Sequence, residues 1–278
     1  MIKCIATDMD GTLLNSMQRI SEENKQAILA AQARGIEVVV STGRSYQEAT
    51  YALEEAGLNC PVICVNGAEV RSKAGEVITS SPIDKQLARA AAARLEEADI
   101  YFEVYTNKGA YTIDPNKAVA ILVDIVLSAN PNVNPDEAAQ ARINDGLIYP
   151  VEDYELLFAS EEHDIYKFLA FSLDADKLKV AEETLASLDE LTVTSSGHDN
   201  LEITNRNAQK GIALESFVKA KNISLSETMA IGDNYNDVSM FERVGKAVAM
   251  GNATYEIKSL CDEVTDTNEE RLFSPFYK

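Results

Sequence analysis

The sequence predicts an α/β fold built on an open parallel sheet, with a second α+β domain inserted into it. Short apolar runs alternate with helical segments over residues 1–81, and the same alternation returns over residues 199–278. Such alternation is typical of parallel strands joined by right-handed crossover helices. Over residues 82–198 the pattern changes, and the predicted strands alternate apolar and polar residues as antiparallel strands do. This change predicts a separate inserted domain.

The first domain is expected to contain a series of buried strands, each ended by turn residues. The predicted strands cover residues 2–6, 36–40, 61–65, 228–231 and 247–250, and residues 68–72 and 76–80 predict a hairpin. The predicted helices cover residues 22–34, 45–57, 207–220 and 237–244. Ser21 is the expected N-cap of the first helix, and Ser45 with Glu48 forms a capping box for the second.

The inserted domain is expected to combine both kinds of element in irregular order. Its predicted helices cover residues 84–98, 116–129 and 175–187, and its predicted strands cover residues 100–105, 110–113, 165–173 and 191–194. The insert carries 22 acidic and nine basic side chains. Charge of this density usually belongs to a solvated face.

Composition excludes several classes of function. The 278 residues carry a net charge of −20, which disfavours nucleic acid and anionic membranes as partners. Four cysteines without a CxxC pair predict buried free thiols and a reducing, cytoplasmic location. The only two histidines, His163 and His198, make a zinc site improbable. We find neither a signal-peptide core nor a run long enough to span a membrane, and no apolar pattern demands an obligate partner, so we expect a monomer or a weak homodimer.

Two carboxylates, Asp8 and Asp10, follow the first predicted strand, and Gly11 follows them. Acids spaced in this way at the rim of a parallel sheet repel each other unless a cation lies between them. The alternative is a simple turn, which Asp-x-Asp-Gly often marks. A calcium loop beginning at Asp8 is excluded, because it requires glycine and glutamate where Leu13 and Arg19 stand.

Three further segments suggest a phosphate site. Ser41-Thr42-Gly43-Arg44 joins a strand to a helix N-terminus, Lys210-Gly211 opens a helix, and Gly232–Asp237 places more acids after a strand. Free amides at helix N-termini bind anions. Taken singly, each segment has an ordinary explanation, because such loops are common and helical lysines are usually solvated.

Together, these segments predict a site for phosphoryl transfer. Asp8, Asp10 and Asp233 all follow predicted strands, and hard oxygen ligands of this kind select Mg²⁺. Thr42, the Gly43 amide and Lys210 would hold the phosphate. A carboxylate nucleophile in such a site forms an aspartyl-phosphate, which water then hydrolyses.

The four segments resemble, in the same order, the four motifs of the haloacid dehalogenase (HAD) superfamily. Asn66-Gly-Ala68 and the size and place of the insert resemble its Cof-type phosphatases, whose Rossmann-like core carries an α+β cap of the C2B type. The resemblance spans the core, residues 1–81 and 199–278, and matches residues 82–198 only in position, size and class. It implies a cap that selects the substrate.

The resemblance also assigns roles to individual residues. It implies that Asp8 is the nucleophile and that Asp10 is the general acid and base, with its backbone carbonyl on Mg²⁺. Asp233 and Asn234 would complete the metal site. The residues implied to hold the phosphate are Met9, Thr42, Gly43, Lys210 and Asn236. The residues implied to support them are Thr12, Arg44, Asn66 and Asp237. Asp237 would orient Lys210 or Thr12.

Three functions remain open from the sequence. The first is an Mg²⁺-dependent phosphatase of small phosphorylated metabolites, with sugar phosphates as the expected class. The second is a phosphomutase of the same superfamily, which would depend on a bisphosphate. The third is a non-catalytic phosphoaspartate switch, against which the large insert counts. The resemblance argues against dehalogenation, because dehalogenases lack the second aspartate of the first motif.

Overall fold

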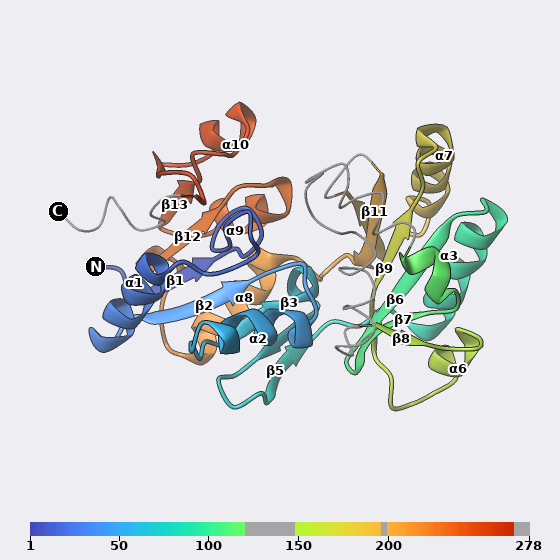
Figure 1. Ribbon diagram of the computed structural model, residues 1–278, viewed down its shortest axis with the longest axis horizontal. Helices are drawn as coiled ribbons and strands as arrows, with labels where there is room; N and C mark the ends of the chain where they lie inside the picture. Colours follow the sequence, from blue (N-terminus) through green and yellow to red (C-terminus); the bar gives the residue numbers. More distant parts are fainter. Residues whose placement is uncertain (120–147, 196–198, 270–278) are drawn as a thin grey trace. The chain divides into compact units, whose positions relative to one another are not determined.

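The computed structural model describes residues 1–119, 148–195 and 199–269 and divides into two compact units (Figure 1). The first unit combines Met1–Ser81 with Asn207–Lys278, and the second is Pro82–Arg206. The second boundary differs from the expected one at residues 198/199. The reason is a strand that the sequence analysis missed, β11 (Asn200–Asn205), which pairs with β9 (Ile165–Phe171) and so belongs to the second unit.

The first unit is built on an eight-stranded sheet whose order is β14-β13-β12-β1-β2-β3-β4-β5. The strands from β14 to β3 are parallel, and the last two form an antiparallel hairpin. Their bounds are β1 Cys4–Thr7, β2 Glu37–Ser41, β3 Val62–Cys64, β4 Glu69–Arg71, β5 Val77–Ser80, β12 Thr228–Gly232, β13 Lys246–Ala249 and β14 Glu263–Val264. The predicted parallel sheet and hairpin are confirmed.

The α-helices described in this unit are α1 (Glu22–Ala33), α2 (Tyr46–Glu55), α8 (Lys210–Ala220), α9 (Val238–Phe241) and α10 (Tyr255–Ser259), with 3₁₀ turns η1 (Val65–Gly67), η2 (Leu225–Glu227) and η3 (Tyr235–Asp237). Three of these five helices, α1, α2 and α10, begin at a side-chain cap. Ser21 and Ser45 cap α1 and α2 as predicted, and the Ser45–Glu48 capping box is present. The helix predicted at 237–244 is wrong in extent, because a 3₁₀ turn precedes a single turn of α-helix.

One part of the core of the first unit lies between the central strands and α8. Leu214, Phe217 and Val218 of α8 are buried against Ala6, Val39 and Ile63 of the sheet. This packing anchors the helix that begins at Lys210. The position of Lys210 relative to β1 therefore follows from apolar burial along the helix that carries it.

The second unit is built on a six-stranded sheet, β10-β11-β9-β6-β7-β8, in which only β7 and β8 pair in parallel. The remaining strands are β6 Tyr101–Thr106, β7 Gly109–Thr112, β8 Ile148–Pro150 and β10 Leu191–Thr194. The described helices are α3 Lys85–Glu97, α6 Glu155–Phe158 and α7 Ala175–Leu185. The sequence analysis missed β8 and α6. Most of the helix predicted at 116–129 lies outside the described residues, as does His198.

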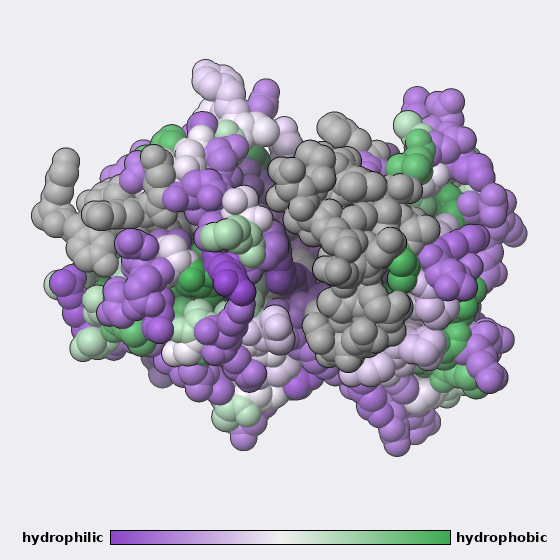
Figure 2. Space-filling model, viewed as in Figure 1, coloured by the Kyte–Doolittle hydropathy of each residue, from purple (hydrophilic) through white to green (hydrophobic). Residues whose placement is uncertain are grey.

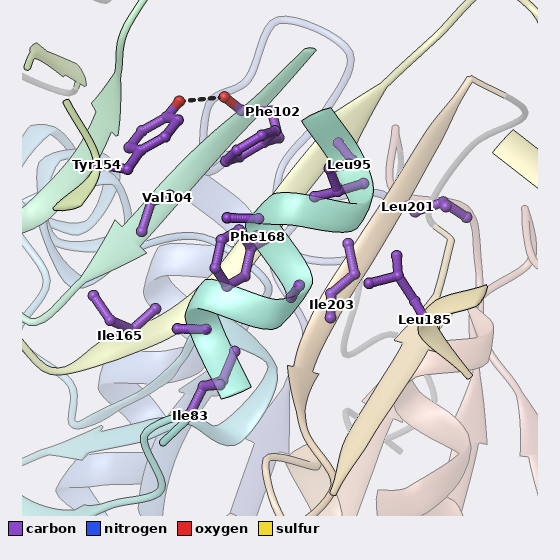
Figure 3. Packing of buried hydrophobic residues seen from close by; sticks show 14 of the residues in the cluster. Ile83, Leu95, Phe102, Val104, Tyr154, Ile165, Phe168, Leu185, Leu201 and Ile203 are labelled. Carbon is purple, nitrogen blue, oxygen red and sulfur yellow. Dashed lines mark hydrogen bonds between the residues drawn. The ribbon is translucent and has the colours of Figure 1, made fainter. Parts of the chain in front are cut away.

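One face of this sheet packs on its helices (Figure 3). Phe102, Phe168 and Ile203 come from three neighbouring strands and are buried together with Leu95 of α3. The Tyr154 hydroxyl donates to the Phe102 carbonyl at the border of this cluster (Figure 3). The second unit thus has a hydrophobic core of its own.

The hydrophilic surface and the free cysteines agree with what the composition predicts. On the face shown in Figure 2 the described surface is mostly hydrophilic, with smaller hydrophobic areas scattered over it. No helix in the described ranges is both long and apolar enough to cross a membrane. All four cysteines are free, and Cys4, Cys60 and Cys64 are buried as predicted.

Candidate active site

Three loops of the candidate site leave the same edge of the first sheet. β1 pairs in parallel with both β2 and β12, so the three strands end side by side. Asp8 follows β1, Thr42 follows β2, and Asp233 follows β12. The central strand of the site therefore carries Asp8, and the flanking strands bring the other two segments to it.

Lys210 joins two of these segments through a buried ion-pair network. Its Nζ donates to Asp8 Oδ1 at 2.6 Å and to Asp237 Oδ1 at 2.7 Å. The Lys210 and Asp237 side chains are fully buried, and the Asp8 side chain is 7% exposed. Burial alone would lower the pKa of Lys210, but Asp237 and Asp8 raise it above its ordinary value. Lys210 is therefore a permanent cation beside Asp8.

Asp237 organises the loop that follows β12. Its Oδ2 accepts the backbone N–H groups of Asp233 at 3.0 Å and Asn234 at 3.1 Å. Gly232 makes room for this arrangement, because a Cβ there would lie 2.4 Å from Asp237 Oδ2. Since both carboxylate oxygens of Asp237 have donors, this residue positions Lys210 and the loop.

Asp233 is held from the first loop. The Thr12 hydroxyl donates to Asp233 Oδ1 at 2.8 Å, which corrects the alternative that Thr12 is oriented by Asp237. Gly11, at φ +76°, leaves no space for a side chain, because a Cβ would lie 2.5 Å from Asp233 Oδ2. The motifs of β1 and β12 are therefore in close contact.

Asp8, Asp233 and Asp237 form a carboxylate cluster in which one oxygen of each residue lies within 4.8 Å of the others. Burial and the two neighbouring acids, opposed by Lys210, raise the pKa of Asp8 well above its usual range. Burial and Asp237 raise the pKa of Asp233 to about 6. One lysine does not balance this charge, and oxygen donors of this kind suit a hard divalent cation such as Mg²⁺. The residues present therefore fit the metal that the sequence predicts.

Asp10 lies outside that cluster, in contact with the second motif. Arg44 Nε donates to Asp10 Oδ2 at 2.8 Å, and Arg44 Nη2 donates to Asp10 Oδ1 at 2.6 Å. The Asp10 side chain is 49% exposed. Gln18 Oε1 accepts a further bond from Arg44 Nη2. The bidentate pair fixes the plane of the Asp10 carboxylate at the solvent-facing side of the loop.

Further residues of the predicted site have the following surroundings. Asn236 Nδ2 donates to Asn66 Oδ1 at 3.3 Å, and the buried Thr42 hydroxyl accepts the Arg44 N–H at 3.1 Å. Met9 is fully buried, and Asn234 caps the turn η3 by accepting the Tyr235 N–H. The Asn234 side-chain oxygen is therefore engaged in the turn.

Sequence reasoning missed three residues that support the site. Gln18 binds Arg44, and Asn252 Nδ2 donates to the Gly11 carbonyl at 2.8 Å. Ser239 Oγ accepts the Gly211 N–H at 3.0 Å beside Lys210. Asn252 follows a predicted strand end, which is a weak signal, and nothing in the sequence marks the other two.

Comparison with known proteins is consistent with this geometry. The family model of haloacid dehalogenase-like hydrolases matches residues 5–271. The phosphatase YwpJ of Bacillus subtilis is 40% identical over 274 residues, covering 97% of this chain and 96% of its own. The Bacillus subtilis 5-amino-6-(5-phospho-D-ribitylamino)uracil phosphatase YwtE is 38% identical over 275 residues, covering 97% and 94%.

A solved structure gives the same result. A haloacid dehalogenase-like hydrolase from Bacillus subtilis superimposes with a TM-score of 0.89 at 38% identity, covering 99% of both chains. The predicted family and fold class are thereby confirmed. The chain belongs to the haloacid dehalogenase-like hydrolases, among the phosphatases of that family.

Proposed function

We propose that the chain is an Mg²⁺-dependent phosphatase of small phosphorylated metabolites that acts through an aspartyl-phosphate on Asp8. The observation that carries the proposal is the buried Lys210 ammonium, which binds one oxygen of Asp8 and is itself held by Asp237. A lysine in this position neutralises the incoming phosphate and keeps the nucleophile at a fixed place.

The proposed reaction has two steps. An Asp8 carboxylate oxygen attacks phosphorus, a bond between them forms, and the bond from phosphorus to the leaving oxygen breaks. Asp10 gives its proton to that oxygen. Asp10 then removes a proton from water, which attacks phosphorus, breaks its bond to Asp8 and releases inorganic phosphate.

Asp8, Asp233 and the Asp10 backbone carbonyl are the groups that would hold Mg²⁺, and we extend the metal site to Asn234 as the sequence motif implies. The ion supplies charge stabilisation to the phosphoryl oxygens. The phosphate donors in this proposal are the Met9 and Gly43 amides, the Thr42 hydroxyl, the Lys210 ammonium and the Asn236 carboxamide.

We propose a monophosphate with a neutral, hydroxyl-rich leaving group, such as a sugar phosphate, as the substrate class. The acidic excess of residues 82–198 disfavours leaving groups that carry several negative charges. The name of YwtE, which specifies a phosphate on a ribityl chain, supports the same class. We expect a higher kcat/KM for a hexose monophosphate than for a nucleoside triphosphate, most clearly at low salt. A higher kcat/KM for the nucleoside triphosphate at low salt would contradict this inference.

The test of the proposed function compares wild type with Asp8→Asn in the presence of Mg²⁺. Wild type should release inorganic phosphate from a sugar monophosphate without added bisphosphate, and acid quenching should trap a phosphoenzyme. Asp8→Asn should do neither, although it remains folded. An isomerised sugar phosphate without free phosphate would show a phosphomutase instead, and phosphate release by Asp8→Asn would overturn the nucleophile assignment.

The unpaired cysteines bear on the cellular location of the protein. Three buried cysteines and one partly buried one, all unpaired, fit a reducing environment, and we propose the cytoplasm.

A further inference from the structure

The turn that follows β3 has an unusual backbone. Val65, Asn66 and Gly67 have φ angles of +49°, +56° and +98°, so three successive residues lie in the left-handed region. Valine is rarely found there, because its branched Cβ clashes with the backbone. All three residues are buried. Such strain persists only where surrounding contacts impose it, and it concentrates at functional sites.

Two backbone hydrogen bonds fasten this turn to the loop after β2. The Val65 N–H donates to the Arg44 carbonyl at 2.8 Å, and the Asn66 N–H donates to the Thr42 carbonyl at 2.9 Å. These bonds span the segment that contains Gly43. The turn therefore sets the position of the Thr42–Arg44 loop.

Two further contacts join the turn to two other segments with proposed phosphate donors. Asn66 Oδ1 accepts from Asn236 Nδ2 at 3.3 Å and packs on Gly43, where a Cβ would lie 3.0 Å from it. On its other side, Gly67 packs on the Gln209 carbonyl, immediately before Lys210, with 2.5 Å to an added Cβ. One turn thus contacts three of the four segments that carry the proposed phosphate donors, the fourth being the loop after β1 with the Met9 amide.

The Asn236 carboxamide has only one orientation that suits this contact. Because Asn66 presents an acceptor, Asn236 must present its amino group, which carries a second N–H. The Asn236 Oδ1 atom is buried and has no hydrogen-bond partner among the described residues. The hydrogen bond to Asn66 is therefore the contact that determines which end of the Asn236 carboxamide faces the turn.

We infer that Asn66 is a positioning residue for phosphoryl binding, which it serves by orienting the Asn236 carboxamide and by placing the Gly43 amide. The inference rests on the proposed function, because it concerns the same phosphate. It explains why a strained asparagine occupies a turn that glycine would form at lower backbone cost.

The test uses one substitution at two sites. Asn66→Gly removes the side chain and relieves the backbone. Asn222→Gly is the matched control, because Asn222 has the same φ of +56° at the end of α8 and is exposed. Both variants should keep or raise the melting temperature. Only Asn66→Gly should weaken inhibition by orthovanadate and by inorganic phosphate, about tenfold, and lower kcat/KM by about 10- to 100-fold.

A double-mutant cycle separates positioning from general damage. If Asn66 acts through Asn236, then Asn66→Gly added to Asn236→Ala should cost much less than it costs in wild type. Asn66→Ser, whose side chain is too short to reach Asn236, should give the same loss and replaces the glycine variant if that does not fold. Full additivity, or equal vanadate inhibition in Asn66→Gly and Asn222→Gly, would overturn the inference. Neither result touches the proposed function, which is tested separately by phosphate release from wild type and from Asp8→Asn.

Discussion

At the scale of single residues, the separation of the two carboxylates after β1 is the feature with the clearest consequence. Asp8 is buried against Lys210, whereas Asp10 is half-exposed and paired with Arg44. The first environment suits a nucleophile held in one place. The second leaves the Asp10 carboxylate in contact with water, as proton transfer requires.

We therefore expect Asp10→Asn to remain folded, to form a phosphoenzyme, and to turn over about 10²- to 10⁴-fold more slowly than wild type. Asparagine still accepts one bond from Arg44 but transfers no proton. Rapid-quench measurement of phosphoenzyme formation and decay distinguishes this variant from Asp8→Asn, which should form none. Turnover within about threefold of wild type would exclude Asp10 as the acid and base.

A second residue-scale prediction concerns Gly211, which follows Lys210. A Cβ at this position would lie 1.8 Å from the Ser239 carbonyl oxygen, so Gly211→Ala must displace α8 or α9. We expect a loss of more than about 3 kcal/mol in the free energy of unfolding, together with a loss of activity.

Gly35→Ala serves as the control for Gly211→Ala. The φ of Gly35 is +78°, but nothing lies within 4 Å of an added Cβ. Gly35→Ala should therefore lose only the free energy of holding alanine in a left-handed backbone conformation, about 1–2 kcal/mol. Urea denaturation of both variants measures the difference. Equal destabilisation would show that the close contact at Gly211 relaxes at little cost.

Asp8, Asp233 and Lys210 were predictable because each directly follows a strand or opens a helix. Asp8, Thr42 and Asp233 are placed by the parallel pairing of β1, β2 and β12, which apolar patterning reveals. The bond between Asn66 and Asn236 was not predictable. It joins positions 170 apart and depends on a left-handed turn that no local pattern specifies.

At the scale of elements, the sequence predicts a helix start where a local side-chain cap is present, as at α1 and α2. The Ser45 side chain accepts the Glu48 N–H, and the Glu48 carboxylate accepts the Ser45 N–H. We expect Ser45→Ala to cost about 1 kcal/mol in the free energy of unfolding. Thr254→Ala is the comparison, because Thr254 caps α10 through one longer bond of 3.4 Å to the Ile257 N–H, and it should cost less. A larger cost at Thr254 would contradict the capping argument.

Strand β11 shows where local patterns fail. Leu201 and Ile203 are buried in the core, as an amphipathic strand requires. The opposite face carries Glu202 and Thr204, which are also buried, so the strand has no exposed polar face to recognise. Polar residues of this kind suggest a loop unless their tertiary partners are known. The expected domain boundary at residues 198/199 therefore precedes this strand.

At the scale of the whole molecule, the site depends on joining distant parts of the chain. Lys210 lies 202 positions after Asp8. Strand β12 pairs with β1 although the complete second unit lies between them in the sequence. The carboxylate cluster therefore forms only when the two chain segments of the first unit come together. Its charge is then a property of the folded state, and it links folding to protons and to metal binding.

This linkage gives the last prediction, which concerns the metal-free protein. The pKa of Asp233 is about 6 in the folded state, above its ordinary value of 3.8. A carboxyl group whose pKa is raised by folding destabilises the folded state once it is ionised. Its effect on stability is absent below pH 4, grows as the pH rises from 4 to 6, and is fully present above pH 6. Burial shifts the pKa of Asp8 in the same direction.

A bound divalent cation should remove this penalty, and protons should compete with it. We expect Mg²⁺ to raise the melting temperature clearly at pH 7.5 and little at pH 5, with its apparent affinity falling roughly tenfold per pH unit below 6. Melting curves with MgCl₂, and with NaCl at equal ionic strength, measure the difference at each pH. Asp233→Asn removes one of the acids, so its metal-free form should gain stability at pH 7.5 and its response to Mg²⁺ should be much smaller. The same Mg²⁺-induced shift at pH 5 and pH 7.5 would show that the ion binds somewhere other than the carboxylate cluster.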